Sequence, residues 1–299
     1  MQKILVPPIT PFNKENKVDA DKLKTHIKNL IDKGVDLIFL NGSNGLGPSL
    51  SAEEKKRNLE KAYEVTDKII FQVGSLNLEE VISLVKFSAD FDIVGVASYP
   101  PFYYPRIPEK WVTKYYSSII EISPHPVYVY NYPLATNFDV TPRIIASLGE
   151  KIEGLKDTTT DISHSLEYKR LIPRLKVYTG SDLLVLSSFS YGLDGVVSAS
   201  GNFVPELLVL IRKLIGEGKI AEAREAQMLI YSLVDIARKY GQLSANYVLT
   251  EIFQGYSVGY PRKPIFELSN EEEKALKEEA KAFHLNFKAL LERHGMKNE

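Results

Sequence analysis

The chain of 299 residues lacks cysteine altogether and has only three methionines and one tryptophan. Without a thiol it cannot form disulfides, and cysteine nucleophiles, iron–sulfur clusters and thiolate zinc sites are excluded as well. There is no charge excess either: 37 basic residues stand against 38 acidic ones, whereas a nucleic-acid-binding protein normally carries a basic face. The five histidines show no metal-ligand spacing, and we interpret His26, His284 and His294 as residues on helix surfaces.

Long apolar segments are missing too. No run reaches the roughly 18 residues of a membrane-spanning helix, and the first residues contain no apolar signal segment. The hydrophobic fraction of 44% and the charged fraction of 25% are ordinary for a globular protein. We therefore expect a cytoplasmic enzyme whose partners are small molecules, with neither nucleic acid nor membrane among them.

What the chain does contain is a regular alternation of short apolar runs and amphipathic segments. Strands are expected at residues 3–6, 35–40, 69–73, 93–97, 126–130, 152–155, 176–179 and 195–197. A helical pattern follows each strand, as at residues 162–171 and 205–216. Eight strand-helix units in about 215 residues predict a parallel (β/α)₈ TIM barrel of the α/β class. No Gly-x-Gly-x-x-Gly follows the first strand, which argues against a dinucleotide-binding fold.

The last part of the chain is expected to be helical. Helical patterns cover residues 220–240, 244–253 and 270–292. We predict a barrel over residues 1–217 that carries the active site. A C-terminal helical extension over residues 218–299 is expected to pack on it.

Candidate site residues follow the predicted strands, because barrel enzymes place their chemistry at the carboxyl ends of the strands. Lys156 ends the sixth strand and Tyr130 the fifth. A strand-end lysine is more often simply exposed, and a lone tyrosine is more often part of a core. If both face one pocket, however, a desolvated amine can attack a carbonyl while the phenol moves protons.

The turn from Gly42 to Gly45 ends the second strand. Glycine and asparagine are common in any turn, so the turn alone is a weak signal. It nevertheless offers a hydroxyl and several backbone N–H groups to an anion such as a carboxylate.

Three motifs together resemble the class I pyruvate-dependent aldolases, the superfamily of dihydrodipicolinate synthase and N-acetylneuraminate lyase. They are Gly42-Ser43-Asn44-Gly45, Tyr130-Asn131-Tyr132-Pro133 and Gly154-Leu155-Lys156-Asp157. The similarity is strongest to the archaeal 2-keto-3-deoxy-gluconate and 6-phosphogluconate aldolases. Segments near residues 46–50, 98–106 and 246–250 are similar to that branch.

The resemblance implies a role for each matching position. Lys156 would form a Schiff base with pyruvate, Tyr130 would relay protons, and Ser43 with the backbone of Asn44 would bind the carboxylate. The remaining implied substrate-binding residues are Gly42, Tyr103, Arg106, Tyr132, Gly180, Ser198, Ala199, Ser200 and Arg238. Among these, Arg106, Tyr132 and Arg238 match a phosphate-binding cluster, and Tyr103 matches an aromatic that enters a neighbouring subunit's site. The family further implies a homotetramer, no metal and no cofactor beyond the covalent lysine.

Some positions depart from the patterns of the family. The turn usually reads Gly-Thr-Thr-Gly, and Asn44 removes one of its two hydroxyls. Ala135 stands where the synthase has an arginine, and Leu46 stands where the sialic-acid lyases have an acidic residue. These two positions disfavour the synthase and the sialic-acid lyases.

The sequence therefore predicts a class I aldolase of an Entner–Doudoroff pathway. It would cleave 2-keto-3-deoxy-gluconate and its 6-phosphate reversibly to pyruvate and glyceraldehyde or its 3-phosphate. Two alternatives stay open. One is a related lyase or synthase with a different aldehyde acceptor. The other is a non-enzymatic 2-oxo-acid-binding protein, for which Asn44 is the only hint.

Overall fold

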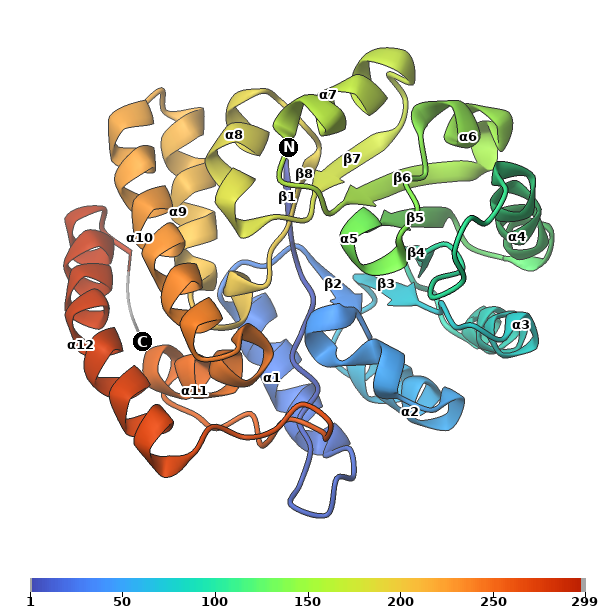
Figure 1. Ribbon diagram of the computed structural model, residues 1–299. Helices are drawn as coiled ribbons and strands as arrows, with labels where there is room; N and C mark the ends of the chain where they lie inside the picture. Colours follow the sequence, from blue (N-terminus) through green and yellow to red (C-terminus); the bar gives the residue numbers. More distant parts are fainter. Residues whose placement is uncertain (1, 297–299) are drawn as a thin grey trace.

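The computed structural model describes residues 2–296, and Figure 1 shows a ring of strands surrounded by helices. All strand pairs are parallel, and β1 pairs with both β2 and β8, so the sheet closes into a barrel. The strands are β1 (Lys3–Val6), β2 (Leu37–Leu40), β3 (Ile69–Gln72), β4 (Gly95–Ser98), β5 (Val127–Asn131), β6 (Ile152–Asp157), β7 (Lys176–Thr179) and β8 (Gly195–Val197). This confirms the predicted (β/α)₈ barrel.

The strands are short and almost wholly apolar because both of their faces are covered. One set of side chains fills the barrel interior: Leu5, Phe39, Ile70, Ala97, Tyr128, Tyr130, Tyr178 and Val197. The alternate residues, such as Ile4, Ile38 and Val129, belong to the larger core between the strands and the helices. This alternation gives every strand end one inward and one outward side chain.

The helices run between the strands and cover the outside of the ring (Figure 1). They are α1 (Ala20–Asp32), α2 (Ala52–Tyr63), α3 (Leu78–Phe87), α4 (Glu109–Ile122), α5 (Pro133–Thr136), α6 (Pro142–Ser147), α7 (Ile162–Leu171), α8 (Val185–Ser190) and α9 (Pro205–Gly216). Ser51 and Ser269 form capping boxes with Glu54 and Glu272, which satisfy backbone N–H groups at the start of α2 and of the helix α12 (Asn270–Arg293).

Three helices follow the barrel: α10 (Ile220–Lys239), α11 (Gln242–Gln254) and α12 (Asn270–Arg293). α10 packs against α9 and α12, and α11 packs against α12. The division of the chain at residue 217 stays a prediction, and residues 1 and 297–299 lie outside the described part. No helix within residues 2–296 has the length and apolar character needed to cross a membrane.

Several details differ from the sequence-based expectations. The sixth strand ends at Asp157 rather than Leu155, so Lys156 is itself part of the ladder. The assignment of His26 to a helix surface is wrong: its side chain is fully buried and its ring nitrogens contact Asn202 and Tyr256. His294 is likewise mostly buried, since only 8% of its side chain is exposed. The periodicity of a helix in the sequence does not show which segments from elsewhere in the chain will cover these histidines.

Candidate active site

Lys156 lies in β6 directly opposite Tyr130 of β5. Its side chain is 6% exposed, and Nζ lies 3.9 Å from the centroid of the Tyr130 ring and 4.7 Å from that of Phe39. Burial among these rings lowers the pKa of Lys156 to about 7, although the negative charge of Asp182 acts in the opposite direction. A substantial fraction of the amine is therefore uncharged near neutral pH and able to attack a carbonyl.

Tyr130 is 1% exposed, and its hydroxyl lies 3.1 Å from Oγ of Ser43. Burial raises the pKa of Tyr130 to about 12, so the phenol keeps its proton at neutral pH. Ser43 belongs to the 3₁₀ turn η1 (Ser43–Gly45) that follows β2. The amine, the phenol and the serine thus come from three strand ends, and the phenol and the serine hydroxyl lie within hydrogen-bond distance of each other.

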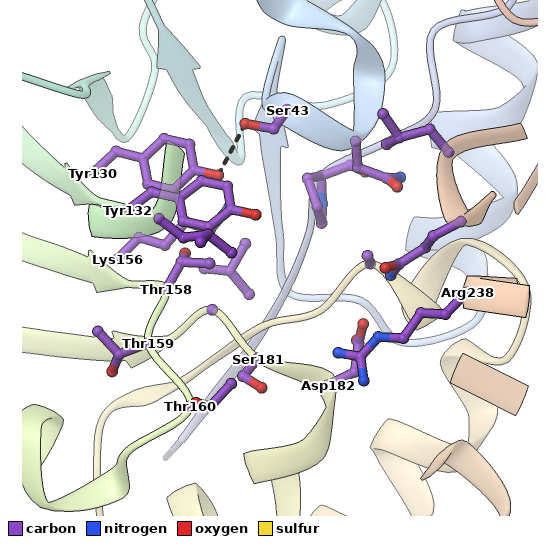
Figure 2. A pocket seen from close by; sticks show the side chains of 18 residues that line it. Ser43, Tyr130, Tyr132, Lys156, Thr158, Thr159, Thr160, Ser181, Asp182 and Arg238 are labelled. Carbon is purple, nitrogen blue, oxygen red and sulfur yellow. Dashed lines mark hydrogen bonds between the residues drawn. The ribbon is translucent and has the colours of Figure 1, made fainter. Parts of the chain in front are cut away.

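These groups line a cavity of about 230 Å³ at the carboxyl ends of the strands, seen in Figure 2. Five further predicted residues line it as well: Asn44, Tyr132, Gly180, Ala199 and Arg238. Tyr132 stacks on Tyr130 at 6.0 Å between ring centroids with an interplanar angle of 13°. Arg238 reaches the cavity from the last turn of α10, in the C-terminal part of the chain.

The predicted residues Ser198 and Ser200 do not line the cavity, although they follow β8. Both hydroxyls are buried and lie 2.9 Å from each other. Oγ of Ser198 and the backbone N–H of Ser200 donate to Oδ1 of Asp182, at 2.5 and 3.0 Å. The two serines therefore hold the carboxylate of Asp182, which does line the cavity. Gly42 also lies just outside it, as the residue that precedes η1.

Tyr103 and Arg106 lie on the loop between β4 and α4, away from the cavity of a single chain. Tyr103 is 82% exposed, and both residues have positive φ, 72° and 57°. A positive φ is uncommon for residues other than glycine, so the loop adopts this backbone conformation at some cost, and both side chains are exposed. Their implied roles stay predictions.

The side chain of Asn44 hydrogen-bonds to other residues of the same chain and so does not take the place of the hydroxyl that the family usually has at this position. Its Nδ2 donates to the carbonyl oxygen of Pro7 at 3.2 Å, and its Oδ1 accepts from Asn246 of α11 at 2.8 Å. Asn44 is 8% exposed. The departure from the family pattern thus ties the η1 turn to β1 and to a helix beyond the barrel.

Sequence reasoning assigned no role to several residues that line the cavity. They are Pro7, Leu134, Thr158, Thr159, Thr160, Ser181, Asp182, Val197, Gln242 and Leu243. Thr158 and Asp182 could have been found, because each stands just after a strand end, as Gly180 does. A Cβ at position 180 would lie 2.1 Å from Oγ1 of Thr158, so only glycine fits at this position. Gln242 and Leu243 begin α11, and no local pattern predicts that this helix reaches the barrel mouth.

The hydroxyl of Thr158 is buried and has no hydrogen-bond partner within the described part of the chain. A buried polar group without a partner is costly, so this hydroxyl is available to a polar ligand. Residues 2–296 contain no group of three or more histidine, aspartate and glutamate side chains placed to hold a metal ion.

An uncharged amine beside a phenol, at the carboxyl ends of neighbouring barrel strands, is the arrangement of a TIM-barrel enzyme that acts on carbonyl compounds. The chain belongs to the dihydrodipicolinate synthetase family, whose model matches residues 1–283. The resemblance predicted from the three motifs is thereby confirmed.

Individual relatives are closely similar over nearly their whole length. The 2-dehydro-3-deoxy-phosphogluconate/2-dehydro-3-deoxy-6-phosphogalactonate aldolase of Sulfurisphaera tokodaii is 56% identical over 273 residues, which are 91% of this chain and 94% of the relative. The 2-dehydro-3-deoxy-D-gluconate/2-dehydro-3-deoxy-phosphogluconate aldolase of Thermoproteus tenax is 43% identical, over 90% of this chain and 88% of the relative. A solved Sulfolobus sulfataricus 2-keto-3-deoxygluconate aldolase in complex with D-KDPG superimposes with a TM-score of 0.95 at 52% identity, over 96% of this chain and 98% of that one.

Proposed function

We propose that this protein is a class I aldolase that cleaves 2-keto-3-deoxygluconate and its 6-phosphate to pyruvate and glyceraldehyde or glyceraldehyde 3-phosphate. The reaction is reversible and serves an Entner–Doudoroff pathway. The observation that carries the proposal is the Lys156 amine, whose pKa is lowered to about 7 and which lies against the Tyr130 ring. The names of the similar archaeal aldolases support the choice of substrate.

The mechanism follows from the two groups. The uncharged amine of Lys156 adds to the C2 carbonyl, and the carbinolamine loses water with a proton supplied through Tyr130 and Ser43. The resulting iminium draws electrons from the C3–C4 bond while the C4 hydroxyl gives up its proton, so the bond breaks and the aldehyde leaves. The enamine that remains takes a proton at C3, and water then releases pyruvate and restores the amine. The electron sink is the lysine iminium, so this scheme requires neither metal nor cofactor.

The direct test measures pyruvate formed from 2-keto-3-deoxygluconate and from its 6-phosphate, and the reverse condensation of pyruvate with glyceraldehyde. We expect turnover in both directions. Condensation only with other aldehydes would assign the chain to a related lyase or synthase. Pyruvate binding without turnover of any aldehyde in a panel would support the binding-protein alternative and reject the proposal.

Arg238 provides a charge for a phosphate at the rim of the cavity. A charge-assisted hydrogen bond is worth about 1.5–3 kcal/mol, which corresponds to roughly 10- to 150-fold. We therefore expect Arg238→Ala to lower kcat/KM for the 6-phosphate about 10- to 100-fold more than for the plain sugar acid. Steady-state kinetics on both substrates measures the ratio.

Arg106→Ala is the companion variant in this comparison. The Arg106 side chain lies outside the cavity of one chain, so the same selective loss would mean that it enters a site only in an assembly. Equal losses on both substrates in Arg238→Ala would contradict the phosphate-binding role.

We further propose that the protein is a homotetramer in which Tyr103 reaches a neighbouring subunit's site. The support is the family resemblance together with the exposure of Tyr103 on the loop between β4 and α4. Neighbouring Tyr104 is also 53% exposed. Two exposed aromatic side chains in succession favour contact with another protein surface.

A further inference from the structure

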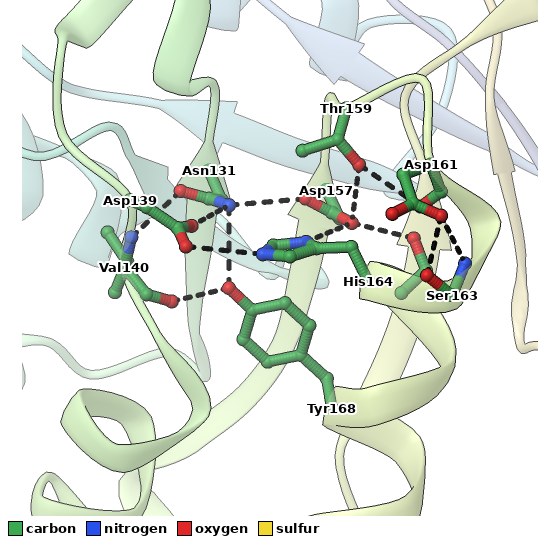
Figure 3. A network of polar contacts seen from close by, with 10 residues as sticks. Asn131, Asp139, Val140, Asp157, Thr159, Asp161, Ser163, His164 and Tyr168 are labelled. Atoms are coloured by element: carbon green, nitrogen blue, oxygen red, sulfur yellow. Dashed lines mark hydrogen bonds and ion pairs between the residues drawn. The ribbon is translucent and has the colours of Figure 1, made fainter.

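The residues that alternate with Tyr130 and Lys156 form a polar network on the opposite face of the same two strands. Asn131 and Asp157 face each other across β5 and β6. Nδ2 of Asn131 donates to Oδ1 of Asp157 at 3.2 Å and to Oδ1 of Asp139 at 2.9 Å. Figure 3 shows this network between the two strands, the chain near Asp139 and the first turns of α7. The side chains proposed to do the chemistry therefore lie on one face of the β5–β6 ladder, and the polar network lies on the other face.

Asp157 is the centre of the network. Its carboxylate is fully buried, and besides Asn131 it accepts hydrogen bonds from Thr159 at 3.1 Å, His164 at 3.0 Å and Ser165 at 2.7 Å. Thr159 belongs to the segment that lines the cavity directly after Lys156. A buried carboxylate with this many partners fixes the backbone around it, because any displacement would leave a charge without hydrogen bonds.

His164 joins the two carboxylates. Its Nδ1 lies 3.0 Å from Oδ2 of Asp157, and its Nε2 lies 3.2 Å from Oδ2 of Asp139. A neutral imidazole has a proton on one nitrogen only, and the other nitrogen would then point a lone pair at a carboxylate. Both contacts are favourable only for the imidazolium. In agreement, the hydrogen bonds to Asp139 and Asp157 raise the pKa of His164 to about 10.

We propose that the imidazolium of His164 is a positioning group for the aldolase site: it locks the ends of β5 and β6 together behind Tyr130 and Lys156. It also offsets the charge of Asp157, which otherwise would favour a protonated Lys156. This inference rests on the proposed Schiff-base function. It assigns a role to Asp139, His164 and Asp157 that is electrostatic as well as mechanical.

Other charged and titratable groups face Lys156 and His164. Those facing Lys156 are Tyr130 of β5, Tyr132 at the start of α5, Tyr178 of β7, Asp182 of the 3₁₀ turn η5 (Asp182–Leu184) and Arg238 of α10. Those facing His164 are Asp139, Asp157, Asp161 and Tyr168. Substitution of His164 replaces none of these residues, but it removes the imidazolium that helps to lower the pKa of Asp139 and of Asp161.

The network offers two substitutions with opposite electrostatic effects. His164→Gln removes a positive charge, so it should raise the pKa of Lys156. Asp139→Asn removes a negative charge, so it should lower that pKa. Both variants lose contacts at the same place, and a purely mechanical role would weaken the site in the same direction in both. The sign of the change in pKa separates the two interpretations.

The experiment measures the rate of borohydride trapping with pyruvate between pH 5 and 9. We expect the midpoint to rise by about 0.5–1 pH unit in His164→Gln and to fall by a similar amount in Asp139→Asn, as for a unit charge several ångströms away at an intermediate dielectric constant. His125→Gln is the matched control, because the ring of His125 hydrogen-bonds the backbone carbonyl of Ser88 and, within residues 2–296, no carboxylate. Its midpoint should not move.

Each outcome decides between the proposals. If the wild-type protein forms no pyruvate adduct on Lys156, the aldolase assignment itself fails. If the wild-type protein is trapped but both network variants keep its midpoint, or move it in the same direction, the inference about His164 is overturned and the aldolase assignment stands. If His164→Gln does not fold, Asp139→Asn alone still tests the inference through the direction of its shift.

Discussion

Replacing Lys156 with methionine is expected to reduce aldol cleavage by a factor on the order of 10⁴ to 10⁶, as the loss of a covalent nucleophile does in other enzymes. The reason is that the amine supplies both the covalent bond and the electron sink. No other lysine among residues 2–296 lines the cavity. Borohydride trapping with pyruvate followed by peptide mapping identifies the lysine that forms the Schiff base. The adduct should be found on Lys156.

The chain contains a natural comparison for this experiment. Lys55 is 2% exposed, and burial lowers its pKa too, but its Nζ donates to the carbonyl oxygen of Gly74 and does not line the cavity. If burial alone were enough, Lys55 would be labelled together with Lys156. A pyruvyl group on Lys55 or on an exposed lysine, with none on Lys156, would overturn the site proposed above.

The pH dependence of trapping follows from the lowered pKa. Lys156 becomes the uncharged nucleophile as the pH rises through about 7, whereas an ordinary lysine does so only near pH 10. Below pH 7 the folded protein must bury an ammonium group that is well solvated in the unfolded chain. Lys156→Met removes this cost, so the variant should be more stable than the wild type at pH 6, and its inactivity cannot result from unfolding. This gain should fade as the pH rises to about 10.5.

Replacing Tyr130 with phenylalanine is expected to lower kcat about 10²- to 10⁴-fold, the range found for a positioned general acid or base. The substitution removes one hydroxyl and keeps the ring that Lys156, Phe39 and Tyr132 contact. The amine should therefore remain buried and uncharged near neutral pH. Single-turnover cleavage of 2-keto-3-deoxygluconate measures the loss.

Tyr247→Phe provides the matched control for Tyr130→Phe. Its hydroxyl is also buried and donates to the carbonyl oxygen of Thr10 at 2.8 Å, but it does not line the cavity. This variant should lose about 1 kcal/mol of stability and little activity. A Tyr130→Phe protein that turns over within about threefold of the wild type would refute the proton-relay role.

The pattern of the sequence was sufficient to predict the barrel and to place Lys156 and Tyr130 near each other at one end of it. Parallel strands buried on both faces give continuous apolar runs, and these runs stand out between amphipathic helices even in a single sequence. The carboxyl ends of such strands meet at one end of a barrel, so Lys156 and Tyr130 could be placed together without coordinates. The position of Ser43 followed for the same reason.

The tertiary structure was needed wherever distant segments meet. The charge state of His164 depends on Asp157 and Asp139, which lie 7 and 25 residues away and approach it only through the fold. The partner of Asn44 is Asn246, on a helix beyond the barrel. Arg238 lines the cavity from the last turn of α10, whereas Arg106 is exposed on the loop after β4 and does not line it. Apolar periodicity specifies which residues lie on one face of an element, but the packing of whole elements decides which polar groups meet and therefore which charges they carry.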